Sequence, residues 1–397
     1  MIFLSIPWDS HLTALRKLKE EAMSTYSAPH PVRLAAHILL ALAAASLQFP
    51  AAAIAQPAQS STSAGQSAPN GLVVVIEDKP NVKQLDLKSL NNPYISGVAL
   101  QIHWSYLEPA EGNPDWSKLD QLFAAAEAQK KWVQLLIFPG FFSPSWALEG
   151  VKTQDFPLQY GPGAGTVEKL PMPWDDVYLN RWFAFVKLLS QRYGNSPAFR
   201  VIAADGPTSV SAEYSLPAKP ADVAIWLTIG YTPSKYLAAW QKTFLTYAAD
   251  FPNQYISLSM GTGLNINNQG KRDAAERQLV RGQVIDEAMS ALGRRFALQF
   301  SNLDGFPGAG PGPRAVPFLI SYNGRAVTGL QLRTSCERNS ANMGAAGNPA
   351  LALQKSFDIG MQPNATGQHV NFLEVYEPDI LAADLQPALG KEASLFK

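Results

Sequence analysis

The chain has 397 residues, of which 47% are hydrophobic and 16% are charged, a composition typical of a globular protein with a sizeable core. Its 32 lysines and arginines equal its 32 aspartates and glutamates, so we expect no basic surface and no nucleic-acid binding. The single cysteine, Cys336, excludes an internal disulfide and a cysteine metal cluster. We interpret it as a buried thiol.

The N-terminal part of the chain predicts export. An apolar stretch at 34–49 follows Arg33 and leads to the small residues Ala53 and Ala55, which is the order of a secretory signal peptide with cleavage before Gln56. As a helix this stretch would span about 24 Å, which is short of the ~30 Å hydrocarbon core of a bilayer. An uncleaved membrane anchor is the alternative.

The sequence therefore divides into three parts. We expect a signal peptide over 1–55, with Met23 as a possible true start, and a flexible Ser/Ala/Gln/Pro linker over 56–70. A single domain over 71–397 should follow, secreted or periplasmic and without stable membrane insertion once the signal is cleaved.

From Gly71 onward, short apolar runs alternate with helical patterns, which indicates βα units. Several runs are almost continuously apolar, as parallel strands covered by helices should be. Eight strands suffice for a closed barrel, so we predict an α/β fold of the (β/α)₈ TIM-barrel type, with an open α/β sheet as the alternative. The expected strands are Leu72–Ile76, Gly97–His103, Trp132–Phe138, Phe199–Ala204, Tyr255–Met260, Phe296–Phe300, Val327–Leu332 and Asn371–Tyr376.

Helices and long loops fill the intervals between these strands. Long Gly/Pro-rich loops follow strands and would wall a groove at one end of a barrel; they are expected at Pro139–Pro173, Gly261–Gln269 and Gly305–Pro317. The expected helices are Trp116–Lys130, Asp175–Tyr193, Pro233–Asp250, Lys271–Leu292 and Pro349–Ile359.

One strand end carries a lone carboxylate. The run Val201–Ala204 breaks at Gly206-Pro207, and the short loop that follows delivers Glu213. Catalytic groups of a (β/α)₈ barrel sit on the loops after the strands, so Glu213 is our candidate acid/base. Asp205, next to the Gly-Pro turn, is interpreted as a turn former.

The segment after the second strand carries a family resemblance. It contains Trp104, Leu107-Glu108-Pro109, Gly112, Asp115-Trp116 and Leu119-Asp120 at the spacing W-x-x-L-E-P-x-x-G-x-x-D-W-x-x-L-D. This stretch resembles that of clan A glycoside hydrolases such as the family-42 β-galactosidases, and Pro144-Ser145-Trp146 is similar to their P-x-W loop. The resemblance implies a barrel glycosidase with its acid/base glutamate on strand four, where Glu213 lies.

Two departures from that family concern the catalytic pair. The family's Asn-Glu at the end of strand four is replaced by Ala212-Glu213, and its nucleophile is expected on strand seven, where this chain offers Gln331 and no carboxylate. Glycoside hydrolysis uses two carboxylates, and the alternation of side chains along strand eight predicts that Glu374 points into the barrel mouth. Glu374 is our second carboxylate, a nucleophile or a base, with Glu377 behind it. If one strand has been counted in excess, Glu374 becomes a strand-seven nucleophile.

Aromatic and polar side chains near strand ends are candidate sugar ligands, because an aromatic face suits the apolar face of a pyranose. Glu108 is interpreted as a local cap, and each aromatic residue is also a candidate for the core. The candidate substrate-binding residues are His103, Trp104, Trp146, Trp174, Gln331, Tyr376 and Glu377.

Other enzyme classes lack their motifs. The chain has no H-E-x-x-H, no P-loop and no strand followed by G-x-G-x-x-G, so we expect neither a metal nor a cofactor. A G-x-S-x-G elbow is absent too. We expect a secreted glycoside hydrolase that cleaves O-glycosidic bonds of an oligo- or polysaccharide, with retention and inversion both open. A carbohydrate-binding barrel without catalysis is the alternative, and a surface scaffold is a third.

Overall fold

The structure is a computed structural model that describes residues 67–158, 164–210, 213–308 and 311–396. The expected signal peptide and most of the expected linker lie outside the described residues. Thr62–Lys397 form one compact unit. Within its described part, no helix combines the length and the apolar character needed to cross a membrane.

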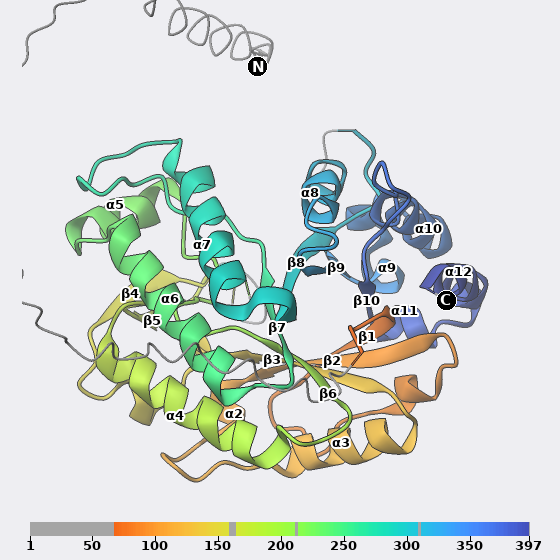
Figure 1. Ribbon diagram of the computed structural model, residues 1–397, viewed down its shortest axis with the longest axis horizontal. Helices are drawn as coiled ribbons and strands as arrows, with labels where there is room; N and C mark the ends of the chain where they lie inside the picture. Colours follow the sequence, from red (N-terminus) through yellow and green to blue (C-terminus); the bar gives the residue numbers. More distant parts are fainter. Residues whose placement is uncertain (1–66, 159–163, 211–212, 309–310, 397) are drawn as a thin grey trace, which may run out of the picture. The chain divides into compact units, whose positions relative to one another are not determined.

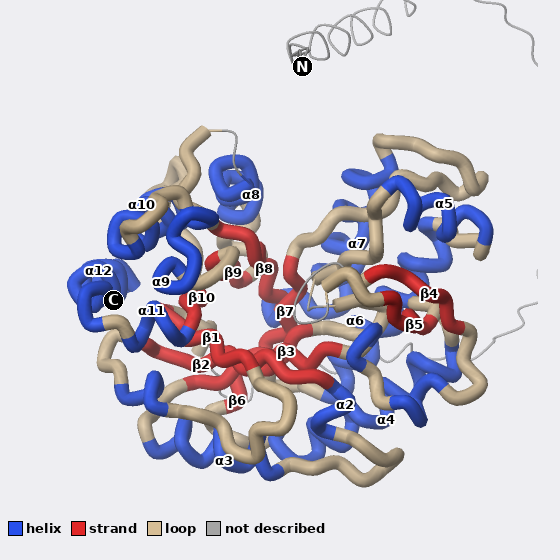
Figure 2. The backbone as a smooth tube through the Cα atoms, turned by 180° about the vertical axis from the view of Figure 1, so that it is seen from behind, coloured by secondary structure: helices blue, strands red, loops and turns tan. Residues whose placement is uncertain are grey.

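Eight parallel strands close into a barrel in the order β1-β10-β9-β8-β7-β6-β3-β2. Figure 2 shows them as an inner ring with the helices outside it. The closure confirms the predicted (β/α)₈ fold, and the open-sheet alternative is wrong. The strands are β1 (Gly71–Glu77), β2 (Ile95–His103), β3 (Trp132–Phe138), β6 (Phe199–Ala203), β7 (Tyr255–Ser259), β8 (Phe296–Leu303), β9 (Val327–Leu332) and β10 (Phe372–Tyr376).

The helices cover the outside of the barrel (Figure 1). The connection from β1 to β2 contains the 3₁₀ helix η1 and no α-helix. Helix α8 begins inside the predicted loop Gly305–Pro317. Helix η1 spans Lys88–Asn91, and the α-helices of the described residues are α2 (Trp104–Leu107), α3 (Ser117–Ala128), α4 (Asp176–Tyr193), α5 (Pro220–Thr228), α6 (Pro233–Asp250), α7 (Glu276–Leu292), α8 (Pro311–Ile320), α9 (Cys336–Asn339), α10 (Pro349–Gly360), α11 (Glu377–Leu381) and α12 (Gln386–Ala393).

Helix α4 shows how sequence pattern becomes packing. The Asp175 side chain caps its first turn by accepting hydrogen bonds from the amides of Val177 and Tyr178, at 3.0 and 3.1 Å. Its apolar residues recur at intervals of three and four and are buried against the barrel. Helix α7, in contrast, begins at Glu276 and not at Lys271, because 271–275 are held in a turn by their own backbone and side-chain bonds.

The predicted loop Pro139–Pro173 contains an antiparallel hairpin of β4 (Thr153–Pro157) and β5 (Val167–Pro171). Phe156 and Leu170 are fully buried, and Phe156 stacks on Trp226 of α5 at 4.6 Å between ring centroids. The prediction of a structureless loop was wrong here, since a strand with a single deeply buried aromatic residue lacks a clear apolar alternation.

The N-terminal end of the barrel is plugged by two aromatic rings. Trp132 and Phe372 meet edge to face with their centroids 5.8 Å apart. Room for them comes from two strand glycines, because a Cβ on Gly97 would lie 2.5 Å from the Trp132 ring and one on Gly329 would lie 2.1 Å from the Phe372 ring. The barrel is therefore packed at this end, and a site inside it has to open at the other.

Candidate active site

The C-terminal ends of the eight strands form the barrel mouth. In a parallel barrel these ends lie together, whatever their separation in sequence. The residues that the described strands and their following loops place there are Glu77, His103, Phe138, Glu213, Ser259, Asn302, Arg333 and Tyr376.

Glu213 is held at this mouth by its backbone and by a hydrogen bond from Asn302. It forms a parallel bridge with Ser259, and the amide of the next residue, Tyr214, donates to the Ser259 carbonyl at 3.3 Å. The loop that leaves β6 thus returns along the end of β7. The Asn302 amide donates to Glu213 Oε1 at 3.3 Å. Burial raises the pKa of the Glu213 carboxyl to about 7, so that it holds a proton near neutral pH.

The loop before Glu213 is locked to the loop after β3. The amide of Phe141 donates to the Ser209 carbonyl at 3.0 Å, and the amide of Gly140 donates to the Tyr178 hydroxyl at 2.8 Å. Gly140 has a φ of 64°, and a Cβ there would lie 2.3 Å from the Ser209 carbonyl oxygen. Only glycine permits this close approach, which brings the loop that carries Glu213 against the loop after β3.

Glu374 faces the barrel interior, one layer below the mouth. Leu373 and Val375 pack outward, as the alternation predicted, but Glu374 is fully buried and does not point into the mouth. Since β10 is the eighth barrel strand, the alternative that placed Glu374 on strand seven is wrong.

Burial raises the pKa of Glu374 to about 8. Among the described residues neither of its oxygens meets a donor at hydrogen-bonding geometry. The nearby side chains of Gln299 and Gln134 offset only part of the rise. These two amides bond to each other, Gln134 donating to Gln299 at 3.1 Å. Gln331 pairs in register with Glu374 and is also buried, so it lines the interior and not the mouth.

Tyr376 lies above Glu374 on the same side of β10 and is partly exposed. Burial raises the pKa of its hydroxyl, and the carboxylates of Glu77, Glu374 and Glu213 raise it further. Tyr376 is the next inward residue of β10 after Glu374, so it lies nearer the mouth than the buried carboxyl, with its proton retained.

An aromatic wall lies at the mouth ends of β2 and β3. His103 stacks on Phe142 with a centroid distance of 3.8 Å and an angle of 10°, and it contacts Tyr106 at 4.7 Å. Burial lowers the pKa of His103 to about 4, so the ring is neutral. The sequence reasoning missed Phe142 and Tyr106, although the Phe141-Phe142 pair directly after strand three was a signal for them.

Two of the candidate tryptophans belong to the packing around Glu108. Trp104 is fully buried and donates from Nε1 to Glu108 Oε2 at 2.8 Å, so its ring has no exposed face for a sugar, and the prediction was wrong for this residue. Trp146 donates to the Glu108 carbonyl at 3.0 Å and packs edge to face on Trp104. Glu108 Oε1 accepts from the Gly112 amide at 2.9 Å, so Glu108 organises the turn.

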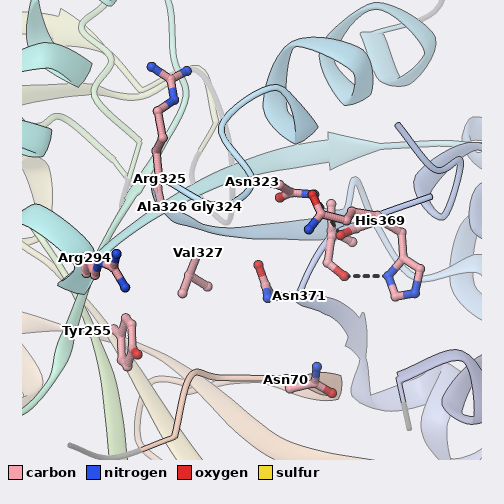
Figure 3. Close-up of a pocket in the computed structure, with 12 residues that line it drawn as sticks. Asn70, Tyr255, Arg294, Asn323, Gly324, Arg325, Ala326, Val327, His369 and Asn371 are labelled. Atoms are coloured by element: carbon pink, nitrogen blue, oxygen red, sulfur yellow. Dashed lines mark hydrogen bonds between the residues drawn. The ribbon is translucent and has the colours of Figure 1, made fainter. Parts of the chain in front are cut away.

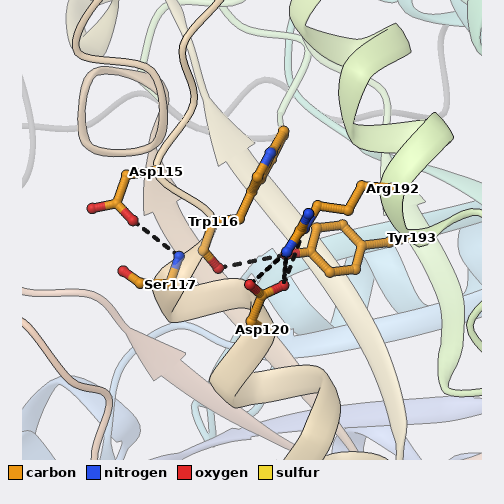
Figure 4. A network of polar contacts seen from close by, with 6 residues as sticks. All are labelled: Asp115, Trp116, Ser117, Asp120, Arg192 and Tyr193. Atoms are coloured by element: carbon orange, nitrogen blue, oxygen red, sulfur yellow. Dashed lines mark hydrogen bonds and ion pairs between the residues drawn. The ribbon is translucent and has the colours of Figure 1, made fainter.

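Asp115 and Asp120 of the family-like segment lie at the outer helices α3 and α4 (Figure 4). Asp115 accepts from the Ser117 amide at the start of α3, at 3.0 Å. Asp120 of α3 pairs with Arg192 of α4 at 2.7 Å and accepts from the Tyr193 hydroxyl at 2.6 Å. The hydrogen bond from Arg192 lowers the pKa of Asp120. The motif therefore holds α3 against α4 and contributes no group to the mouth.

Trp174 and Glu377 also have partners of their own. Trp174 packs with Trp226 and Tyr231 at centroid distances of 6.1 and 5.8 Å, beside α5. Glu377 begins α11 and accepts from the Ser89 hydroxyl at 2.9 Å, which ties α11 to η1.

Two further residues lie in the interior of the protein. Asp205 is fully buried at the end of β6, and burial raises its pKa well above the usual range. Its main-chain carbonyl accepts from Trp182 Nε1 at 2.7 Å. Cys336 is fully buried, and burial raises the pKa of its thiol.

A cavity of about 470 Å³ lies at the opposite end of the barrel (Figure 3). Its lining includes Arg294, Arg325, His369 and several amides, but no carboxylate. It cannot supply the acid that glycoside hydrolysis needs. Within the described ranges, no group of three His, Cys, Asp or Glu side chains is arranged to hold a metal ion.

Comparison with known proteins gives a likeness of fold. No protein-family model matches the sequence, and no curated protein matches it. The chain is similar to a β-galactosidase from the psychrophilic Marinomonas ef1, with 14% identity and a TM-score of 0.46 over 82% of this chain and 58% of that one. It is also similar to xylanase B from Clostridium stercorarium F9, with 11% identity and a TM-score of 0.45 over 78% and 86%. The chain thus spans little more than half the length of that β-galactosidase.

Proposed function

We propose that the protein is a glycoside hydrolase that cleaves O-glycosidic bonds of an oligo- or polysaccharide, with Glu213 as its acid. The observation that carries this proposal is a carboxyl with a pKa of about 7 at the mouth of a closed parallel barrel. At pH 7 an unperturbed glutamic acid is almost entirely ionised, whereas burial keeps the proton on a substantial fraction of Glu213. Burial thus increases the protonated form that a general acid needs.

The second carboxylate of the proposed mechanism is Glu374. Its full burial argues against direct attack on a sugar, and this leaves the role of a base that acts through one water. The water oxygen would bond to the anomeric carbon while its proton passes to Glu374, which accepts it in the ionised form that is the minor form below its pKa of about 8. Glu213 would give its proton to the departing glycosidic oxygen. This course inverts the anomeric configuration. Tyr376, above Glu374, would orient the water.

The rest of the mouth fits a sugar ligand. The stacked rings of His103 and Phe142 offer an apolar surface, and His103 adds no charge because its pKa is about 4. The apolar stretch at 34–49 supports export, so that the substrate would be met in the periplasm or outside the cell.

The test is Glu213→Gln, assayed on a panel of aryl glycosides and polysaccharides. We expect turnover to fall by about 10²- to 10⁴-fold, the usual contribution of a general acid. Glu392→Gln is the matched control, because burial also raises the pKa of Glu392 to about 7 but Glu392 lies on the outer helix α12. Unchanged turnover in Glu213→Gln, or an equal loss in both variants, contradicts the proposal.

A carbohydrate-binding barrel without catalysis is the second candidate. It is favoured by the burial of Glu374 and by Gln331 at the place where strand seven would carry a nucleophile. Calorimetry separates the two functions. Wild-type protein that binds glycans, hydrolyses none of them and keeps its affinity in Glu213→Gln would establish the binding function.

A further inference from the structure

The mouth carries a cation at the end of strand seven. Arg333 follows β9 directly, and its amide donates to the Leu303 carbonyl at 2.8 Å, which continues the ladder with β8. Arg333 lies one residue beyond β9, in a bend at the mouth end of this strand. Its side chain is 46% exposed, so the guanidinium is open to solvent at the top of the barrel.

Asp304 forms an ion pair with this guanidinium but accepts no hydrogen bond from it. Asp304 is fully buried, and its Oδ1 accepts from the Phe306 amide at 3.2 Å. Its Oδ2 lies 3.6 Å from Arg333 Nη1, which is longer than a hydrogen bond. The ion pair therefore orients the arginine by charge, and the planar fork of N–H groups keeps its capacity for a ligand.

Arg333 and Glu213 contact the same strand end. Asn302, which donates to Glu213, lies in the irregular end of β8, where the pairing with β9 shifts between Phe300 and Leu303. Asp304 follows two residues later. A continuous chain of contacts thus runs from the carboxyl of Glu213 through the end of β8 to the guanidinium of Arg333.

The acids around the mouth do not exclude an anion. Glu77 pairs with Arg338 at 3.7 Å, and Asp78 pairs with Lys118 at 2.7 Å. Burial raises the pKa values of Glu213 and Glu374 to about 7 and about 8, which reduces their negative charge near neutral pH. The exposed guanidinium therefore faces surroundings in which most negative charge is compensated.

We infer that Arg333 binds an anionic group of the substrate, so that the preferred glycan carries a carboxylate or a sulfate on the sugar next to the scissile bond. This inference rests on the proposed function of the same mouth. An arginine fork matches the paired oxygens of a carboxylate or a sulfate, and such charge-assisted bonds are stronger than neutral ones. Lysine would supply the charge but not the planar fork.

The experiment measures binding separately from hydrolysis. Calorimetric titrations use Glu213→Gln protein with three sets of oligosaccharides: uronic acids, sulfated galactans and their neutral counterparts. We expect uronate or sulfated ligands to bind, and we expect the additional Arg333→Gln change to weaken that binding by about tenfold to a hundredfold. Arg333→Lys should restore only part of the affinity. Which of the two anionic sets binds more tightly identifies the group.

Arg294→Gln is the matched control, because it removes one positive charge from the cavity at the opposite end of the barrel. It should leave binding unchanged. Equal or tighter binding of the neutral set, no binding of either anionic set, or an unchanged affinity in Arg333→Gln overturns the inference. So does a loss in Arg294→Gln that equals the loss in Arg333→Gln. Unchanged turnover in Glu213→Gln contradicts the proposed function alone, since these affinities are read without turnover.

Discussion

Replacing Asn302 by aspartate should raise the pKa of Glu213. At present the Asn302 amide donates to Glu213 Oε1 at 3.3 Å, and a donor favours the ionised carboxylate. An aspartate at this position cannot donate when ionised, and it adds a like charge at the same distance. Both changes favour the protonated form of Glu213, so the direction of the shift is upward.

The expected size of this shift follows from the separation of the two groups. Two like charges about 4 Å apart repel by about 4 kcal/mol at an effective dielectric constant of about 20. Since one pKa unit corresponds to about 1.36 kcal/mol, the upper limit is about 3 units. The two carboxyls of Asn302→Asp would share protons as a coupled pair. We therefore expect the upper apparent pKa to rise from about 7 by about 1 to 2 units.

The assay is a pH titration of side-chain ¹³C resonances in glutamate-labelled protein, with the Glu213 signal assigned from its absence in Glu213→Gln. This readout does not depend on turnover. Asn180→Asp is the control, because Asn180 lies on α4 and accepts from Lys242 at 3.0 Å, outside the barrel. A Glu213 pKa near 4.5 in the wild type, or no upward shift in Asn302→Asp, would refute the electrostatic account of the mouth.

Three further predictions concern stability. Glu374 has a pKa of about 8 in the folded protein and about 4.5 in the unfolded chain, so it should make wild-type stability fall as pH rises between these values. Glu374→Gln should make this fall shallower, because Glu213 and Glu392 still contribute to it, and in urea unfolding at pH 8 it should stabilise by about 2–4 kcal/mol. A fall in Glu374→Gln as steep as in the wild type would contradict that reasoning. Gly329→Ala should lower the free energy of unfolding by about 3 kcal/mol, because the new Cβ would meet the Phe372 ring. Gly282→Ala in α7 is the control, because its Cβ meets nothing and the change should be neutral or stabilise by up to about 1 kcal/mol. Equal melting temperatures of the two variants would exclude the aromatic plug. Asp120→Asn should lower the unfolding free energy by about 1 kcal/mol at pH 7 and by less at pH 3. An unchanged melting temperature would mean that the Asp120–Arg192 pair does not stabilise the packing of α3 on α4.

The strands were predictable because their signal is local. The run Trp132–Phe138 is buried at every position, and continuous burial of this kind follows from helices that cover parallel strands. Helix α4 was equally clear from its apolar spacing and its Asp175 cap. The β4–β5 hairpin was missed because its strands are short and have few buried residues, so they lack the continuous burial that marks the barrel strands.

The site was predictable only in part, because contacts at the mouth join distant segments. Glu213 could be proposed from its place after a strand. Its partner Asn302 is 89 residues away and lies in an irregular strand end that no sequence pattern indicates. Arg333 was not predicted either. It lies directly after strand seven, and the exposure of a residue in that position depends on how the barrel closes.

Alternation along a strand predicts the side on which a residue lies but not its depth. On β10 the inward residues are Phe372, Glu374 and Tyr376, and they occupy three successive layers. Phe372 belongs to the aromatic plug at the bottom, so the next inward residue has to lie in the middle of the barrel and only the third can reach the mouth. A carboxyl able to touch a sugar directly from strand eight would have to stand where Tyr376 does. The chemistry of this mouth therefore depends on whether Glu374 exchanges a proton with a water beside Tyr376. Tyr376→Phe should then reduce turnover, and Glu374→Gln should stabilise the Tyr376→Phe protein as much as it stabilises the wild type.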